Sequence, residues 1–236
     1  MKIQLCVLAS GLALAFGSAA YAGGHHGTPS ANDAETYQSG FKNDAEILQL
    51  YNGDATAYIG QEGSWNSGNA TQDNTSNSDV DVWQAGRANQ ANATQTNARN
   101  AESDVVQEGQ KNQATTNQSN GIGQVANVYQ AGTRNVGVTT QWDGQNQDAN
   151  IYQAGLKNDA NVRQWNGDGQ DAEIAQSGQS NYGEVSQENG RVQDANIYQA
   201  GTRNLATVSQ SGSYATANAS QFGTANNSSI TQVGAW

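Results

Sequence analysis

The 236-residue chain has one cysteine, one proline and two histidines. Cys6 lies in the first 22 residues, so a chain that begins after them has no disulfide and no thiolate chemistry. Pro29 precedes the repeated part of the chain, which proline therefore does not interrupt. His25 and His26 are adjacent, so regular structure would point their side chains apart, and we interpret them as a solvated tail; a metal-binding pair is the alternative.

Positive charge and hydrophobic residues are also scarce. The chain carries 10 Lys and Arg against 21 Asp and Glu, for a formal net charge of -11. This balance argues against a nucleic-acid or anionic-membrane partner. Only 35% of the residues are hydrophobic, a composition that with abundant Asn, Gln, Ser and Gly is typical of disorder. Strict periodicity changes that interpretation, because stacked repeats pair their backbone groups without a large apolar core.

The first 22 residues predict a secretory signal peptide. Lys2 supplies the positive charge, residues 5–16 the apolar stretch, and Ala20-Tyr21-Ala22 a small-residue cleavage site. We expect cleavage between Ala22 and Gly23. The apolar run is short for a membrane anchor. The chain is therefore expected to be exported.

Glutamine recurs every 23 residues, and a second row follows the first by 11 residues. The first row is Gln38, Gln61, Gln84, Gln107, Gln130, Gln153, Gln176 and Gln199; the second is Gln49, Gln72, Gln95, Gln118, Gln141, Gln164, Gln187 and Gln210, after which Gln221 and Gln232 follow at spacings of 11. A glutamine amide has both donors and an acceptor, so stacked glutamines can bond to one another along a row. The spacing predicts a repeat protein without an active site.

Glycine and asparagine keep the same period. The motif is Gln-x-Gly-x-x-Asn, with glycine at Gly40, Gly63, Gly86, Gly109, Gly132, Gly155, Gly178 and Gly201, and asparagine at Asn43, Asn66, Asn89, Asn112, Asn135, Asn158, Asn181 and Asn204. Glycine supplies positive φ and asparagine tolerates turns, so we predict a tight turn that leads into a strand.

Residues between the turns alternate with period two. In the unit that begins at Asn158, one face carries Asn158, Ala160, Val162 and Gln164, whereas the other carries Asp159, Asn161 and Arg163. Period two predicts strands, and two strands per 23 residues form one coil of a β-solenoid. We expect an all-β, cross-β, amyloid-like stack over residues 38–236, with eight repeats and a shortened terminal one, preceded by a flexible, disordered leader at residues 23–37. Small and β-branched residues fill its thin interior, with amide ladders along the edges.

The last unit is irregular, and neither end of the repeat array shows a polar cap. Gln199, Gln210, Gln221 and Gln232 are 11 residues apart, and Ala215 stands where we expect asparagine. Uncapped coils present unpaired strand edges to another copy. The two ends differ, so their contact does not close and builds filaments.

These units resemble the curlins, bacterial secreted proteins that form functional amyloid. The resemblance lies in the tandem motif small-x5-Gln-x-Gly-x-x-Asn-x-Ala-x3-Gln, which residues 147–164 illustrate and which covers residues 38–232. Gln124, Gln147, Gln170 and Gln193 replace the small residue in the later units and indicate extra amide ladders.

The resemblance implies the function and the partners. It implies export through a dedicated outer-membrane secretion pore with accessory factors, nucleation by a curlin nucleator subunit, and assembly into extracellular curli fibres on the cell surface, for adhesion and biofilm matrix. The leader, residues 23–37, occupies the place of the family's secretion-targeting segment. Because the nucleating, minor subunit has a basic final repeat and no Lys or Arg follows Arg203, we favour the major fibre subunit. The alternatives are the minor subunit and a monomeric β-solenoid adhesin or calcium-binding roll.

Other candidate sites have simpler explanations. Asp79 and Asp81 lie on the outward face without a histidine or pocket, so we expect no catalysis, cofactor or metal. Asp and Gly in the second turns resemble a calcium-binding roll, whose period is nine rather than 23. Lys42, Lys111, Arg134, Lys157 and Arg203 share one turn position and predict a basic stripe, which is either a solvated face or a docking strip for an anionic matrix polymer. Trp142 and Trp165 share another position, where they stack or bind glycans or dyes.

Overall fold

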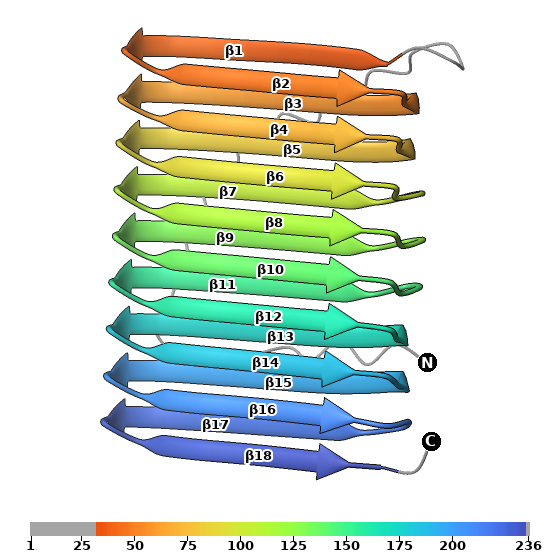
Figure 1. Ribbon diagram of the computed structural model, residues 1–236. Helices are drawn as coiled ribbons and strands as arrows, with labels where there is room; N and C mark the ends of the chain where they lie inside the picture. The colour runs from red at the N-terminus through yellow and green to blue at the C-terminus, as the bar shows by residue number, and fades with distance from the viewer. Residues whose placement is uncertain (1–31, 235–236) are drawn as a thin grey trace, which may run out of the picture.

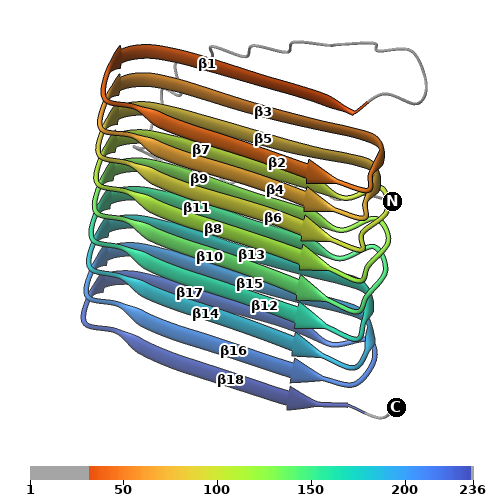
Figure 2. The ribbon, with the colours of Figure 1, turned by 45° about the horizontal axis from the view of Figure 1, so that its top comes forward.

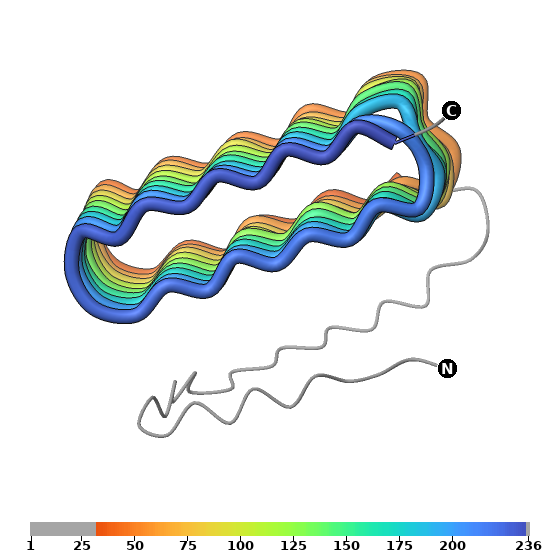
Figure 3. The backbone as a smooth tube through the Cα atoms, turned by 90° about the horizontal axis from the view of Figure 1, so that it is seen from below, coloured from red at the N-terminus to blue at the C-terminus, as the bar shows by residue number. Residues whose placement is uncertain are grey.

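The computed structural model describes residues 32–234, in which every regular element is a β-strand. The chain winds through nine flattened coils stacked along one axis (Figures 1 and 2). Each coil has an odd-numbered strand, a first turn, an even-numbered strand and a second turn. The view along the axis superposes the coils into a single narrow loop of two facing strands (Figure 3). The predicted all-β solenoid is confirmed, and the described residues include no helix able to cross a membrane.

Two nine-stranded parallel sheets face each other. The first sheet contains β1 (Asp33–Phe41), β3 (Gly53–Ser64), β5 (Ser76–Arg87), β7 (Glu102–Gln110), β9 (Val125–Thr133), β11 (Asp148–Leu156), β13 (Asp168–Gln179), β15 (Arg191–Thr202) and β17 (Thr216–Thr224). The second contains β2 (Asp44–Leu50), β4 (Ser67–Asp73), β6 (Gln90–Thr96), β8 (Gln113–Ser119), β10 (Val136–Trp142), β12 (Asp159–Trp165), β14 (Tyr182–Glu188), β16 (Leu205–Ser211) and β18 (Asn227–Val233).

The register follows the 23-residue period. Gln38 aligns with Gln61 between β1 and β3, and Gln49 aligns with Gln72 between β2 and β4. Parallel in-register strands place identical columns of side chains at about 4.7–4.9 Å along the stack. The offset falls to 22 between β15 and β17, where Asp194 pairs with Thr216, and between β16 and β18, where Leu205 pairs with Asn227. The shortened segment is therefore the second turn of the eighth coil.

The core is a thin layer to which both sheets contribute a column of small residues and a column that contains β-branched ones. Ile59, Val128 and Ile174 are fully buried on the first sheet. A Cβ added to Gly68 would lie 2.9 Å from a methyl of Ile59, and one added to Gly137 would lie 2.8 Å from a methyl of Val128. β-branched residues on one sheet thus pack against alanine or glycine on the other, as period-two alternation predicts.

The first strand begins earlier than the expected leader boundary. β1 starts at Asp33, so residues 33–37, expected in the flexible leader, are strand instead. They pair with β3 in register, from Asp33 with Thr56 onward. Residues 23–31 of the leader, the signal peptide, the Ala22–Gly23 cleavage site and both histidines lie outside the described residues.

Candidate functional site: amide ladders and open ends

Two rows of glutamine amides run the length of the stack inside the core. In each row Nε2 of one glutamine donates to Oε1 of the glutamine in the next coil. The bonds of the first row, from Gln38 to Gln221, are 2.8–2.9 Å long, and those of the second, from Gln49 to Gln232, are 2.8–3.0 Å. The inner members are almost fully buried. They lie within the core rather than along its edges, where the sequence placed them.

Each amide is also fixed to the backbone across the coil. Nε2 of Gln61 donates to the carbonyl of Asp44 at 2.7 Å, and Nε2 of Gln72 donates to that of Ser78 at 3.1 Å. Both hydrogens of an inner amide are therefore used, one along the row and one across the coil. Because an unpaired buried amide is unfavourable by about 1–3 kcal/mol, the rows hold the coils in one register.

The asparagine row works through the backbone. Oδ1 of Asn66 accepts the backbone N–H of Asn89 at 3.1 Å, while its Nδ2 donates to the carbonyls of Glu62 and Gly86. Asn66 is 1% exposed and points inward. Asn66 lies between β3 and β4, in the predicted turn, and the left-handed residue of that turn is the one just before it, Trp65, with φ 64°.

The motif glycines have the predicted positive φ but lie near the ends of strands rather than within the turn. Gly132 has φ 114°, and a Cβ there would lie 2.1 Å from the carbonyl oxygen of Gly155. Neighbouring coils approach so closely at this column that only glycine fits.

A third glutamine row confirms the extra ladders expected in the later repeats. Gln124, Gln147, Gln170 and Gln193 are linked by bonds of 2.6–2.8 Å. The second turn contains the compensating change, because Gly121, Gly144, Gly167 and Gly190 each lie directly over one of these amides. The row begins abruptly, and Oε1 of Gln124 has no partner within residues 32–234, since the coil before it has Ala101 at that position.

Sequence reasoning missed two members of the columns. Gly223 has φ 102° and pairs with Gly201, and the backbone N–H of Asn226 donates to Oδ1 of Asn204 at 3.1 Å. They occupy the glycine and asparagine columns of the last coil, so Ala215 does not replace the asparagine; it belongs to the shortened second turn. Measuring the motif from Gln221 instead of Gln210 would have found both.

Carboxylates line up on the outer face of β5 and β7. Asp79 pairs in register with Glu102, and Asp81 with Asp104. Burial, and then the charges of Asp79 and Glu102, raises the pKa of Asp81 to about 6. Burial, and then Glu102, Asp81 and Asp79, raises the pKa of Asp104 to about 7. Like charges stacked one coil apart favour protonation.

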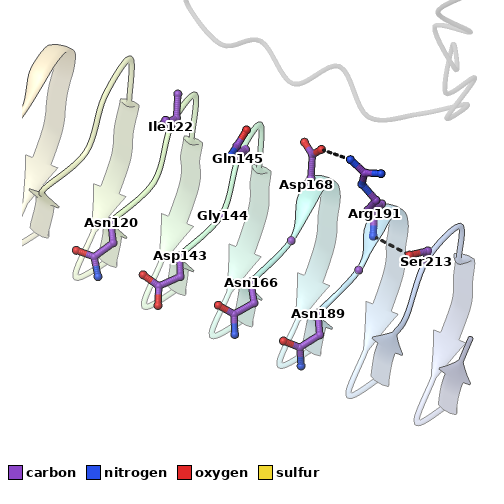
Figure 4. Close-up of a pocket in the computed structure, with 12 residues that line it drawn as sticks. Asn120, Ile122, Asp143, Gly144, Gln145, Asn166, Asp168, Asn189, Arg191 and Ser213 are labelled. Atoms are coloured by element: carbon purple, nitrogen blue, oxygen red, sulfur yellow. Dashed lines mark hydrogen bonds and ion pairs between the residues drawn. The ribbon is translucent and has the colours of Figure 1, made fainter. Parts of the chain in front are cut away.

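The second turns form a shallow polar groove along the stack (Figure 4). One row of side chains contains Asn120, Asp143, Asn166 and Asn189, and the other Ile122, Gln145, Asp168 and Arg191, around a volume of about 710 Å³. Asp168 and Arg191 form an ion pair at 3.7 Å. Across residues 32–234, no group of three or more acidic, histidine or cysteine side chains is placed to hold a metal. The calcium-roll alternative therefore gains no support here.

The two ends of the stack are chemically complementary. At the first coil, Oε1 of Gln38 and of Gln49 receives no donor from the described residues, whereas both Nε2 groups donate inward. At the last coil, Gln221 and Gln232 each accept through Oε1 and use one amide hydrogen on a backbone carbonyl. The other amide hydrogen of each has no acceptor within residues 32–234. One end thus offers acceptors where the other offers donors.

A stack of in-register β coils joined by one-way amide ladders is the β-solenoid class of repeat protein. The family model of the curlin associated repeat matches residues 30–63 and 193–223. Residues 64–192, between the two matches, continue the same glutamine, glycine and asparagine columns. The chain therefore contains curlin associated repeats near both ends of the stack. No curated protein matches the chain closely.

Proposed function

We propose that this chain is a secreted structural subunit that polymerises end to end into extracellular curli-type amyloid fibres. Support comes chiefly from the polarity of the amide rows, since every glutamine donates toward the C-terminal end of the stack. A second copy placed against that end offers Oε1 of Gln38 and Gln49 to the open amide hydrogens of Gln221 and Gln232. Two like ends would oppose donor to donor or acceptor to acceptor, so addition is polar and heterologous.

The strands at the two ends also match in length. β17 and β1 have 9 residues each, and β18 and β2 have 7 each. With Gln221 opposite Gln38, the register places Asn226 opposite Asn43, whose backbone N–H then meets the open Oδ1 of Asn226. The same junction covers exposed apolar side chains such as Phe41, Leu50 and Val233.

The remaining parts of the proposal rest on the matches to the curlin associated repeat. The chain serves as the major fibre subunit in adhesion and biofilm matrix, is exported through an outer-membrane pore by way of its leader, and begins assembly on a nucleator subunit. It has no catalytic role.

Assembly kinetics of the chain without residues 1–22 test the proposal. We expect a lag that preformed fibres remove, and fibres that bind thioflavin and give cross-β diffraction. A purified chain that stays monomeric and soluble at high concentration for weeks would falsify it. Chelator-sensitive folding of such a monomer would favour the calcium-binding roll instead.

A further inference from the structure

The first turn has one left-handed residue in each of the nine coils, always in the same column. The nine residues are Lys42, Trp65, Ala88, Lys111, Arg134, Lys157, Ser180, Arg203 and Ala225, with φ between 53° and 64°. Lys111, Arg134 and Lys157 occupy three consecutive coils and are exposed, and we call them the basic ridge. Their backbone N–H groups bond to the preceding coil at 2.9 Å in each case, so the three side chains leave the stack from equivalent positions.

Backbone conformation does not explain why this column is basic. The second turn has a left-handed position of the same kind, with φ between 48° and 55°, where asparagine predominates: Tyr51, Asn74, Asn97, Asn120, Asp143, Asn166 and Asn189. Asparagine is the non-glycine residue that most readily adopts this conformation. The first turn contains no asparagine, aspartate or glycine in its column. Two turns with the same φ thus carry different chemistry.

Among the residues that the structure describes, the ridge charges have no counterion. Ion pairs within residues 32–234 join Arg163 to Glu184 and Arg191 to Asp168, and neither pair lies at the first turn. Lys42 differs, because its Nζ lies 4.3 Å from the centre of the Trp65 ring. Three aligned and unpaired cations on a chain of net charge -11 form a local field of the opposite sign.

The ridge is only one residue wide. The outer faces of the two sheets flank the ridge. They carry an acidic residue at each outer coil of the ridge, Glu108 in the coil of Lys111 and Asp159 in the coil of Lys157. Beside Arg134, in the middle coil, the same two positions are the neutral Ala131 and Val136. A broad polyanion such as duplex nucleic acid would meet these carboxylates as well as the cations. A single extended chain with one carboxylate per residue meets the cations alone.

We propose that the basic ridge binds a linear acidic polysaccharide of the polyuronate kind, laid along the stack axis. Its successive carboxylates engage Lys111, Arg134 and Lys157 in turn, with Arg134 able to bind its carboxylate through two parallel N–H groups. The cations repeat at the coil spacing of about 4.7–4.9 Å, which is comparable to the length of one extended sugar residue. The ridge lies within one chain and is complete without a second copy, so it does not depend on fibre formation.

The test is co-sedimentation of assembled protein with sodium polygalacturonate at several salt concentrations. The triple variant Lys111→Asn, Arg134→Asn and Lys157→Asn keeps a residue that suits left-handed φ, so folding and thioflavin-monitored assembly are retained. We expect its affinity to fall at least tenfold. For flexible single strands, each neutralised charge contributes roughly 0.7 to the slope of log affinity against log salt concentration. Because the variant removes three charges, the magnitude of that slope should fall by about two.

The matched control removes the same charge elsewhere, with Arg99→Gln, Arg163→Gln and Arg191→Gln, and should keep affinity within about twofold. A gain-of-function variant, Ser180→Lys, joins the ridge to Arg203 in five consecutive coils and should bind more tightly. Equal losses in the two triple variants, or no gain from Ser180→Lys, would overturn the ridge as the site. Duplex DNA that binds as tightly as polygalacturonate, or neutral dextran that binds at all, would overturn the class of partner.

Discussion

Gln210 donates a 2.8 Å hydrogen bond from its Nε2 to Oε1 of Gln232, the last glutamine of its row. Gln232 in turn donates to the carbonyl of Thr216 at 2.8 Å. Its other amide hydrogen has no acceptor within residues 32–234. The bond between Gln210 and Gln232 therefore repeats the amide-to-amide bond of every earlier coil, and Gln232 has no glutamine after it to accept the next such bond. In the proposed fibre, Gln49 of the next copy completes it.

Gln232→Glu is expected to make a subunit that stops growth. The carboxylate cannot donate and would face Oε1 of Gln49 in the next copy, a mismatch worth about 1–3 kcal/mol. Elongation of the variant alone should slow at least tenfold. Mixed into wild-type chain at a low ratio, the variant should still add through its intact first coil and then block the next addition. Dye fluorescence in seeded reactions measures both effects.

Thr231→Glu is the matched control, because it adds the same charge on the outer face of the same strand and keeps the ladder. Its elongation rate should stay within about twofold of wild type. If it inhibits as strongly as Gln232→Glu, charge at the end, and not the missing donor, sets the rate.

Gly144 and Gln147 should be coupled in a double-mutant cycle. A Cβ on Gly144 would lie 2.3 Å from the amide of Gln147, so Gly144→Ala should destabilise the coil by about 2 kcal/mol or more. Adding Gln147→Ala removes the clash and should recover much of the loss. The third coil already contains the doubly substituted pair, because it has Ala98 and Ala101 in the columns of Gly144 and Gln147. Urea denaturation of the chain before it assembles provides the free energies, and additive effects would contradict the coupling.

The same corner illustrates how far the sequence predicts the fold. Period two and the 23-residue spacing were enough to predict the strands, the register and the glutamine rows, because each depends on a local pattern repeated in every coil. The pairing of Gly144 with Gln147 was not predicted, since it depends on packing inside one turn. The inward face of the asparagine column was predicted from period two, but the left-handed position of Trp65 was not, because only the backbone path shows which residue of the turn has positive φ.

Thr139→Val should stabilise the chain. Oγ1 of Thr139 is buried and has no partner in the described part of the chain, whereas Thr116, in the same column, shares a 2.6 Å bond with Ser103. Valine has nearly the same shape, so the change removes an unsatisfied hydroxyl and should raise the free energy of unfolding by about 1 kcal/mol. Thr116→Val is the control and should have the opposite sign, because it leaves Ser103 unpaired. Stabilisation by both changes would contradict this account.

Assembly should accelerate as the pH falls from 8 toward 5. The pKa of Asp104 is raised to about 7 and that of Asp81 to about 6 in the folded stack, against an ordinary 3.8. The folded state therefore holds these protons more tightly than the unfolded chain, so stability rises as pH falls through the raised values and is complete near pH 4. Asp79 and Glu102 reinforce the shift, while Tyr58 and Asn127, in the adjoining strands of the same column, are uncharged in this range.

The double variant Asp81→Asn and Asp104→Asn should flatten this dependence and assemble at pH 8 about as fast as wild type does at pH 5. Glu62→Gln with Asp73→Asn changes the net charge equally and serves as the control. If the assembly rate of the Asp81 and Asp104 variant still rises as the pH falls, the acceleration is due to net charge and not to these two carboxyl groups.

A disulfide across the junction tests the central claim most directly. The chain without residues 1–22 has no cysteine, and the proposed register places Ser229 opposite Glu46 of the next copy, at the parallel-strand spacing that a disulfide can bridge. Fibres of the Glu46→Cys and Ser229→Cys double variant, oxidised after assembly, should give covalent dimers, trimers and longer ladders on non-reducing denaturing gels. Leu48→Cys with Ser229→Cys, two residues out of register, should give few. Cross-linked dimers from Ser229→Cys alone, or no ladder from the in-register pair, would contradict polar end-to-end stacking.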